Sequence, residues 1–259
     1  MSFLSGKIAV VTGGSRGIGA AIATRLAADG AAVAVNYASH QAEANDVVQK
    51  IVQAGGKGIA IRADVSKTED VRLLFKEVAE RFEGLDMLIN NAGATHIRPM
   101  PIADATDETY DETFAVNTKG TFLCLREAAK LMRRGGRIVN LSSTGVFSAH
   151  PGYAIYSAAK SAVEVFTRVF CKELKGRNIT VNCIAPGATA TEQWLKGKSE
   201  ELLQTIANLS PLNRLGTPED IAGLVAFLVS PQGERRVSTS LRQVLTEFIE
   251  SFHLTSQVC

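Results

Sequence analysis

Short apolar stretches alternate with amphipathic helical patterns along most of the chain, and this alternation restricts the fold more than any other feature. The stretches are rich in Val, Ile or Ala and comprise residues 8–12, 32–37, 58–62, 87–90, 137–141 and 180–184. Between them, residues 71–82 carry apolar side chains at helical spacing. Continuously apolar strands are buried on both faces, so these repeated strand–helix units predict an α/β fold with a doubly wound parallel sheet.

The pattern predicts one domain over residues 1–234, followed by an atypical tail over residues 235–259. No linker or repeat interrupts the first segment. In the tail the strand signals stop, and apolar residues from Leu241 to Phe252 fall at helical spacing. Two interpretations are open: an appended helix that forms an interaction surface, or an altered reading frame or engineered end with coincidental periodicity. We favour the second and expect the tail to be poorly ordered or repacked.

Charge and composition argue against two classes of protein. The 28 Lys and Arg nearly balance the 26 Asp and Glu, giving a net charge of +2 without a long basic run, so nucleic-acid binding is disfavoured. No apolar run approaches the length of a membrane span, and the start of the chain does not resemble a signal peptide. Four cysteines lack metal-site spacing: Cys124, Cys171, Cys183 and Cys259. We therefore expect a cytoplasmic protein with reduced thiols and no metal site.

A glycine-rich turn links the first apolar stretch to the first helical pattern. Gly13, Gly17 and Gly19 have the spacing G-x-x-x-G-x-G, which differs from the G-x-G-x-x-G dinucleotide fingerprint. The physical reason for glycine is the same, because residues without Cβ let the backbone approach a pyrophosphate at a helix N-terminus. A tight strand-to-helix connection is the alternative interpretation. Its place in the first strand–helix unit favours a nucleotide site.

The end of the second apolar stretch indicates which dinucleotide is bound. NAD sites usually place Asp or Glu there to hold the ribose 2′-hydroxyl. Here Ala38 and Ser39 follow the stretch, and the first acidic residue is Glu43. A carboxylate would repel a 2′-phosphate, whereas Ser39 would not, and Arg16 adds a planar cation. Arg16 could also be a solvated loop cation, but the pattern favours NADP over NAD.

Tyr156 and Lys160 are four residues apart in a helix predicted over residues 154–175, so they share one face. A phenol with a pKa of about 10 is a poor base at neutral pH. A nearby ammonium would stabilise the phenolate and bring the tyrosine pKa towards the working range of a general acid or base. The spacing alone is weak, and a solvated helix cation is the alternative interpretation of Lys160.

Together these motifs closely resemble the short-chain dehydrogenase/reductase family. The resemblance extends from residue 5 to about residue 233 and follows the family's order at residues 12–19, 64–65, 90–93, 117, 143, 156–160 and 186–187. It implies a single-domain Rossmann-like sheet and an oxidoreductase. The family usually ends with a further strand, which the atypical tail is expected to replace.

By this resemblance four residues are expected to be catalytic. Tyr156 would protonate the carbonyl oxygen during reduction, and Lys160 would lower the tyrosine pKa and hold the nicotinamide ribose. Ser143 would hydrogen-bond the substrate oxygen; it is chosen over Ser142 because it lies thirteen residues before Tyr156, as in the family. Asn117 would hold a water that relays protons from Lys160.

The resemblance also implies an NADP(H) site. Asp64 and Val65 would frame the adenine, residues 91–93 would line the adenosine ribose, and residues 186–191 would contact the nicotinamide side. The expected contacts are Gly13, Ser15, Arg16, Gly17, Ile18, Gly19, Ala38, Ser39, Asp64, Val65, Asn91, Ala92, Gly93, Tyr156, Lys160, Pro186, Gly187, Thr189 and Thr191. Taken singly, residues 90–93 could be a strand-ending turn, Ser143 a backbone cap and Asn117 a helix kink.

Loops at residues 94–106, 144–155 and 188–215 are expected to set the substrate. They carry a moderately apolar lining of His96, Met100, Val146, Phe147, His150, Tyr153 and Trp194, and nothing in them demands a phosphate, a carboxylate or a metal. The chain looks similar to the 3-oxoacyl-carrier-protein reductase and carbonyl reductase branch. That similarity implies NADPH-dependent reduction of a ketone, such as a β-keto ester or thioester, to a secondary alcohol.

Two alternative functions remain open at this point. One is an NAD-linked alcohol or sugar dehydrogenase of the same family, and the other is a cofactor-sensing protein without turnover. Because family members commonly assemble through their long helices and last strand, a homotetramer or homodimer is expected.

Overall fold

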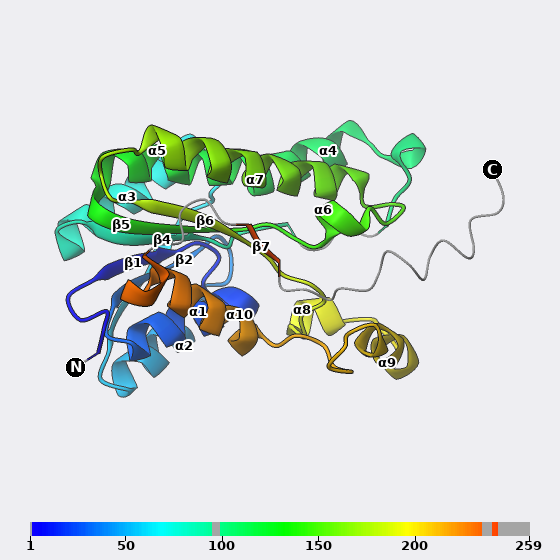
Figure 1. The fold of residues 1–259 in the computed structure, drawn as a ribbon, viewed down its shortest axis with the longest axis horizontal. Helices are drawn as coiled ribbons and strands as arrows, with labels where there is room; N and C mark the ends of the chain where they lie inside the picture. Colours follow the sequence, from blue (N-terminus) through cyan, green and yellow to red (C-terminus); the bar gives the residue numbers. More distant parts are fainter. Residues whose placement is uncertain (1, 95–98, 235–239, 243–259) are drawn as a thin grey trace.

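The computed structural model describes residues 2–94, 99–234 and 240–242, which build one parallel sheet of seven strands (Figure 1). The strands are β1 (Ile8–Val11), β2 (Ala32–Tyr37), β3 (Lys57–Arg62), β4 (Leu85–Asn90), β5 (Met132–Leu141), β6 (Thr180–Ala185) and β7 (Ser240–Arg242). Their order is β3-β2-β1-β4-β5-β6-β7, and each neighbouring pair is parallel. The predicted doubly wound sheet is therefore confirmed.

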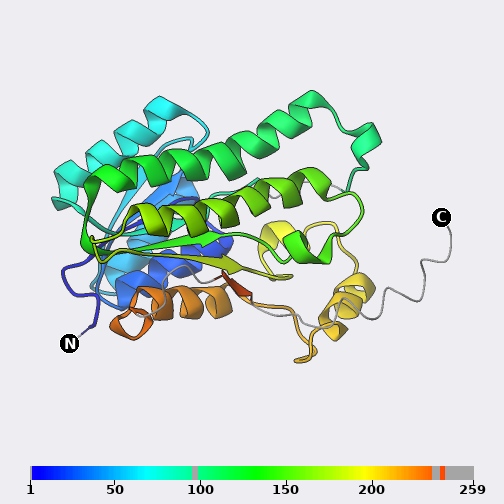
Figure 2. The same ribbon diagram turned by 45° about the horizontal axis from the view of Figure 1, so that its top comes forward.

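Helices cover both faces of the sheet. They are α1 (Gly17–Ala28), α2 (Gln41–Gln53), α3 (Thr68–Phe82), α4 (Asp107–Phe114), α5 (Thr121–Leu131), α6 (Gly145–Ser148), α7 (Ala154–Glu173), α8 (Glu192–Leu195), α9 (Glu200–Asn208) and α10 (Pro218–Val229). Shorter turns are η1 (Ile102–Asp104), the π-helix η2 (Ala115–Gly120) and η3 (Pro231–Gly233). Helices α3, α5 and α7 lie on one face and α1, α2 and α10 on the other (Figures 1 and 2).

Each face of the sheet has its own apolar core. The predicted helical spacing around residue 75 is confirmed, because α3 buries Val71, Leu74, Phe75 and Val78 against the sheet. On the opposite face, side chains of α1, α2 and α10 form the second core. Within the described ranges, no helix is both long and apolar enough to cross a membrane.

Strand boundaries differ from the predictions mainly at β5, which begins at Met132 rather than at residue 137. The extra residues include two arginines and two glycines, which carry no strand signal. Their pairing with β4 shifts register between Leu85 and Met87, as in a β-bulge. Apolar patterning therefore predicts the buried half of this strand and misses its polar start.

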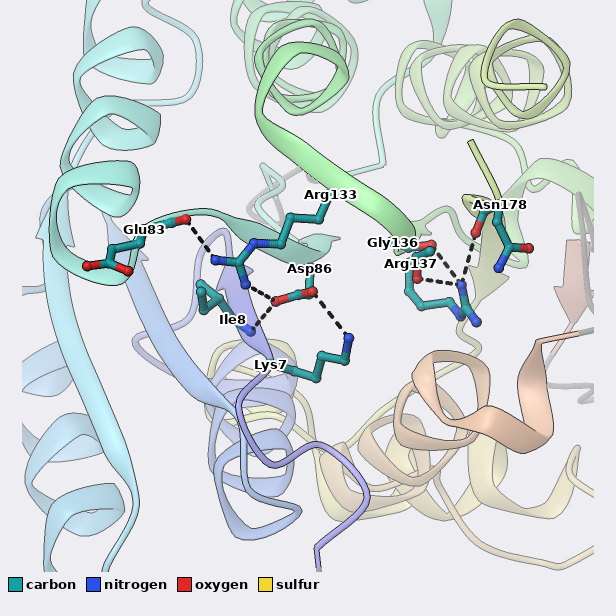
Figure 3. A network of polar contacts seen from close by, with 9 residues as sticks. Lys7, Ile8, Glu83, Asp86, Arg133, Gly136, Arg137 and Asn178 are labelled. Carbon is teal, nitrogen blue, oxygen red and sulfur yellow. Dashed lines mark hydrogen bonds and ion pairs between the residues drawn. The ribbon is translucent and has the colours of Figure 1, made fainter. Parts of the chain in front are cut away.

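A buried carboxylate anchors the amino-terminal edge of the sheet (Figure 3). Asp86 accepts hydrogen bonds from the backbone of Ile8 (3.0 Å), from Arg133 (3.3 Å) and from Lys7 (3.4 Å). Beside it, Arg137 donates to the carbonyl oxygens of residues 135, 136 and 178. These contacts hold the amino-terminal ends of β1, β4 and β5 together, at the end of the sheet opposite to the predicted site residues.

Of the predicted tail, the structure describes residues 240–242, and they form a strand rather than the helix that one of the two interpretations requires. Leu241 lies in β7, which pairs with β6 from Cys183↔Ser240 to Ala185↔Arg242. The physical reason is that an edge strand presents unpaired N–H and C=O groups, which a further extended segment can satisfy. Residues 235–239 and 243–259 lie outside the described residues, and a domain boundary near residue 234 stays a prediction.

The topology places a crevice at the carboxyl ends of the strands. The chain leaves β1 towards one face and β4 towards the other, and ligands of doubly wound sheets bind at such a switch point. Helices α6 and α8 lie at this end of the sheet, and α9 extends beyond it (Figures 1 and 2). The predicted site residues follow the carboxyl ends of these strands or lie on the helices beside them.

Candidate active site

The turn after β1 has the geometry that a dinucleotide phosphate requires. Gly13 and Gly17 adopt positive φ angles of 60° and 53°, and a Cβ at Gly19 would overlap the carbonyl oxygen of Gly13. Asn91 holds the turn by donating to the carbonyl oxygens of residues 12 and 13, at 2.9 and 3.0 Å. In the described structure no side chain caps the first turn of α1 and no acid lies in it, so its amides fit an anionic pyrophosphate.

A chain of polar side chains lies beside this turn. Arg16 Nη1 is 2.9 Å from Nε2 of His40, and Nδ1 of His40 is 3.0 Å from the Ser39 hydroxyl. Arg62, the last residue of β3, donates to the carbonyl oxygen of Ala38 at 3.2 Å. The structure thus joins the predicted Arg16 and Ser39 through a histidine that the sequence analysis did not select.

Two residues predicted to frame the adenine already make internal contacts. The Asp64 carboxylate accepts hydrogen bonds from the backbone and hydroxyl of Ser66, at 3.0 and 2.7 Å. Val65 is buried in the core beneath α3 and α5, and a Cβ at Gly120 would lie 2.8 Å from its side chain. Contact between Val65 and a nucleotide would have to come from its main chain.

Ser143, Tyr156 and Lys160 converge where β5 ends and α7 begins. Burial of the Tyr156 hydroxyl raises its pKa, and a hydrogen bond with Ser143 acts in the opposite direction. Lys160 is buried one turn further along α7, with Nζ 5.9 Å from the centre of the Tyr156 ring. Burial lowers the pKa of Lys160 to about 8. Perturbed titrating groups that meet in this way are typical of catalytic sites.

The pKa of Tyr156 is shifted in the opposite direction to that expected from the sequence. The sequence predicts that a nearby ammonium lowers this pKa. In the structure, burial disfavours both charged forms, and Nζ of Lys160 donates to the main-chain oxygen of Leu141 at 2.9 Å. Desolvation therefore outweighs the hydrogen bond with Ser143, and the pKa of Tyr156 is raised.

Asn117 lies in the π-helix η2, an element that is frequent at functional sites. Its Nδ2 donates to the carbonyl oxygen of Thr113 at 3.0 Å, and its buried Oδ1 has no hydrogen-bond partner within the described residues. A Cβ at Gly93 would lie 2.9 Å from this Oδ1 and 3.4 Å from Nζ of Lys160. The acceptor and the ammonium therefore face the same small space, which glycine leaves open.

The segment after β6 closes the site from the opposite side. The carbonyl oxygen of Pro186 accepts from the backbone of Thr144 at 3.0 Å, which ties the ends of β5 and β6 together. Thr189 donates to the carbonyl oxygen of Gly187 at 3.0 Å. A Cβ at Gly17 would lie 3.1 Å from the methyl of Thr191, so this segment contacts the glycine turn.

The remaining predicted contacts also lie around the turn. Ser15 is buried, Ile18 packs against the core, and the backbone amide of Ala92 donates to the Thr12 hydroxyl at 3.0 Å. His96, expected in the substrate lining, lies outside the described residues.

Comparison with known proteins decides the family. Residues 13–238 match the family model described as Enoyl-(Acyl carrier protein) reductase. A short-chain type dehydrogenase/reductase of Picea abies is 44% identical over 239 residues, which cover 89% of this chain and 88% of that protein. The chain belongs to the short-chain dehydrogenase/reductase family.

Two further relatives of this short-chain dehydrogenase/reductase are informative. An NADPH-dependent aldehyde reductase-like protein, chloroplastic, of Arabidopsis thaliana is 42% identical over 243 residues, covering 89% of this chain and 90% of that protein. The crystal structure of the angucycline C-6 ketoreductase LanV with bound NADP has a TM-score of 0.87 and 35% identity, covering 93% of this chain and 95% of that one. The family and the fold expected from the motif order are confirmed.

A buried carboxylate beneath the site of this short-chain dehydrogenase/reductase was missed in the sequence. Glu164 lies one turn after Lys160 on α7 and is buried. It accepts a hydrogen bond from the Ser142 hydroxyl at 2.9 Å, so Ser143 is the serine that meets Tyr156. The signal that could have found Glu164 is an acidic residue on the same helical face as Tyr156 and Lys160.

Proposed function

We propose that this short-chain dehydrogenase/reductase uses NADPH to reduce a ketone to a secondary alcohol, with Tyr156 as the proton donor. The observation that carries the proposal is the convergence of Ser143, Tyr156, Lys160 and Asn117 at the carboxyl edge of the sheet. These groups provide a hydrogen-bond donor, a proton donor, a cation and a free buried acceptor within one crevice.

NADP(H) is the cofactor supported by both geometry and comparison. The open amides of α1 and the glycine turn would hold the pyrophosphate, and Arg16 and Ser39 would face the 2′-phosphate. The NADPH-dependent relative and the NADP-bound ketoreductase support the same choice. When bound, the reduced nicotinamide supplies the hydride.

The chain's own residues supply the proton and its environment. Ser143 would donate a hydrogen bond to the substrate oxygen and so stabilise the charge that develops there. Tyr156, whose pKa is raised, holds its proton at neutral pH and can deliver it to that oxygen. Lys160 would hold the nicotinamide ribose, and the free Oδ1 of Asn117 would hold a water that returns the proton.

The substrate class follows from the walls of the site. Val146, Phe147, Tyr153 and Trp194, which are expected to line it, are half-buried, and Nζ of Lys198 lies 4.3 Å from the centre of the Trp194 ring. Within the described residues, no group of three or more His, Cys, Asp or Glu could hold a metal. A moderately apolar ketone such as a β-keto ester or β-keto thioester fits this lining.

The working unit is proposed to be a homo-oligomer. Large apolar side chains are exposed on α5 and α7, including Phe122, Val165 and Val169. Phe122 also lines a surface hollow of about 460 Å³ with Phe114 and Phe166. Burial of this face against a second copy would remove apolar surface from water.

The test follows NADPH absorbance with a β-keto ester, comparing the parent enzyme with Tyr156→Phe. NADPH loss in the parent and a fall of about 100-fold or more in the variant are expected. A trans-2-enoyl thioester gives a control for C=C reduction, and NADH gives a control for cofactor choice. Turnover of the enoyl substrate alone, or faster turnover with NADH, would replace the proposal by another activity of the family.

A further inference from the structure

We propose that His40 is a specificity-determining residue of this enzyme. Its imidazole links the guanidinium of Arg16 to the hydroxyl of Ser39 and so holds the cation where a 2′-phosphorylated dinucleotide is selected over an unphosphorylated one. The inference rests on the proposed use of NADP(H). It concerns the residue that holds the Arg16 guanidinium in position to bind the 2′-phosphate.

Chemistry fixes the direction of both hydrogen bonds. A guanidinium has no acceptor, so Arg16 Nη1 donates to Nε2 of His40 across 2.9 Å. An imidazole that accepts at Nε2 is neutral and carries its proton on Nδ1. Nδ1 therefore donates to the Ser39 hydroxyl across 3.0 Å. The histidine works as a two-ended bridge between the glycine turn and the end of β2.

The imidazole is not needed to form the helix on which it stands. His40 is the N-cap residue of α2, yet its side chain makes no capping hydrogen bond. His40 contributes to the helix through its main chain instead, since its carbonyl oxygen accepts a hydrogen bond from the backbone N–H of Ala44 at 3.1 Å. Replacing the imidazole should therefore leave α2 in place and release Arg16.

The surroundings of the bridge suit an added anionic group. Residues 36–42 contain no acidic side chain. Arg62 holds the same loop from β3 through the carbonyl oxygen of Ala38, so two guanidiniums flank residues 38–40. Arg16 itself is exposed, and an exposed arginine loses much side-chain entropy when it binds a phosphate. The hydrogen bond to His40 restrains the Arg16 side chain before the cofactor binds, so less entropy is lost on binding.

A matched pair of variants tests the bridge. His40→Leu removes both hydrogen bonds, whereas His40→Gln retains one acceptor and one donor. Dissociation constants for NADPH and NADH are measured by nicotinamide fluorescence, with circular dichroism as a check of folding. We expect His40→Leu to weaken NADPH binding about 3- to 10-fold while NADH binding changes less than about twofold. His40→Gln should keep most of the parent's preference.

The link through Arg16 is tested by a double-mutant cycle. In an Arg16→Met background, His40→Leu should have no further effect on the ratio of the two dissociation constants. An unchanged ratio in the single variant, equal weakening of both cofactors, or a full effect of His40→Leu without Arg16 would each overturn the inference. A parent enzyme that does not prefer NADPH would instead overturn the proposed cofactor, so the two failures are distinguishable.

Discussion

Lys160 donates a hydrogen bond of 2.9 Å from Nζ to the main-chain oxygen of Leu141, the last residue of β5. The ammonium is thereby held at the carboxyl edge of the sheet although burial lowers its pKa to about 8. A buried cation that makes one main-chain contact is costly for stability. Its position beside Tyr156 gives it a functional reason to be there.

The first prediction concerns Lys160→Met. The pKa of Lys160 is about 8 in the folded protein and near 10.5 in the unfolded chain. The buried charge therefore lowers the free energy of unfolding by its full amount below pH 8, and this loss of stability declines as the pH rises to 10.5. At pH 7 the variant should be more stable by about 1–3 kcal/mol and less active by about 100-fold or more. Urea unfolding at pH 7 and pH 9.5 measures the difference, which should narrow at the higher pH.

The control for this prediction is Lys67→Met, because the Lys67 side chain is exposed. It should change neither the stability nor its pH dependence by more than about 0.5 kcal/mol. A Lys160→Met enzyme that is less stable than the parent at both pH values would contradict the assignment of a buried-charge penalty.

The second prediction concerns Gly93→Ala. The added Cβ would enter the space between Oδ1 of Asn117 and Nζ of Lys160, at 2.9 and 3.4 Å. We expect kcat to fall about 10- to 100-fold because both polar groups would be displaced by a fraction of an ångström. The measurement is steady-state ketone reduction with saturating NADPH.

Gly223→Ala is the matched control, since a Cβ at Gly223 in α10 would meet nothing within 4 Å. It should leave kcat unchanged and stabilise the fold by about 0.5–1 kcal/mol. Gly93→Ala with parental kcat would show that the small space takes no part in turnover.

The sequence predicted those parts of the site whose spacing reflects a regular element. Tyr156 and Lys160 share a helical face, and the glycine turn follows the first strand, so the sequence pattern predicts both. His40 was missed because its partner Arg16 is 24 residues away, and no local pattern links the two. The side-chain contact exists because β1 and β2 are neighbours in the sheet.

Burial and strand pairing explain two other differences between sequence and structure. The raised pKa of Tyr156 depends on how deeply its hydroxyl is enclosed, which spacing along a helix does not reveal. Leu241 fits a helical repeat in the sequence, but it pairs with the open edge of β6 as part of β7. In both cases the tertiary structure decides the outcome, through desolvation at Tyr156 and through strand pairing at Leu241.

The third prediction concerns the apolar face of α5 and α7. Val169→Glu places a charge one helical turn from Val165 on the proposed contact face, so it should shift the parent oligomer to a smaller species. Sedimentation velocity measures the change. Leu73→Glu on α3, an apolar position that is more exposed than Val169, serves as the control and should keep the parental mass. A monomeric parent would contradict the proposed assembly.

The fourth prediction concerns Glu164, which accepts the Ser142 hydrogen bond at 2.9 Å and lies 3.8 Å from Arg168. Glu164→Ala would leave the buried Ser142 hydroxyl without this partner and should cost about 1–3 kcal/mol of stability. Because Ser142 precedes Ser143, we also expect a lower kcat with little change in the NADPH dissociation constant.

Glu164→Gln separates positioning from simple packing. Its amide oxygen can still accept from Ser142, so it should recover most of the stability and kcat even though the negative charge is lost. The measurements are urea unfolding, kcat and NADPH binding for both variants. If glutamine lowered kcat as much as alanine at parental stability, the charge of Glu164 rather than its hydrogen bond to Ser142 would be what the active site uses.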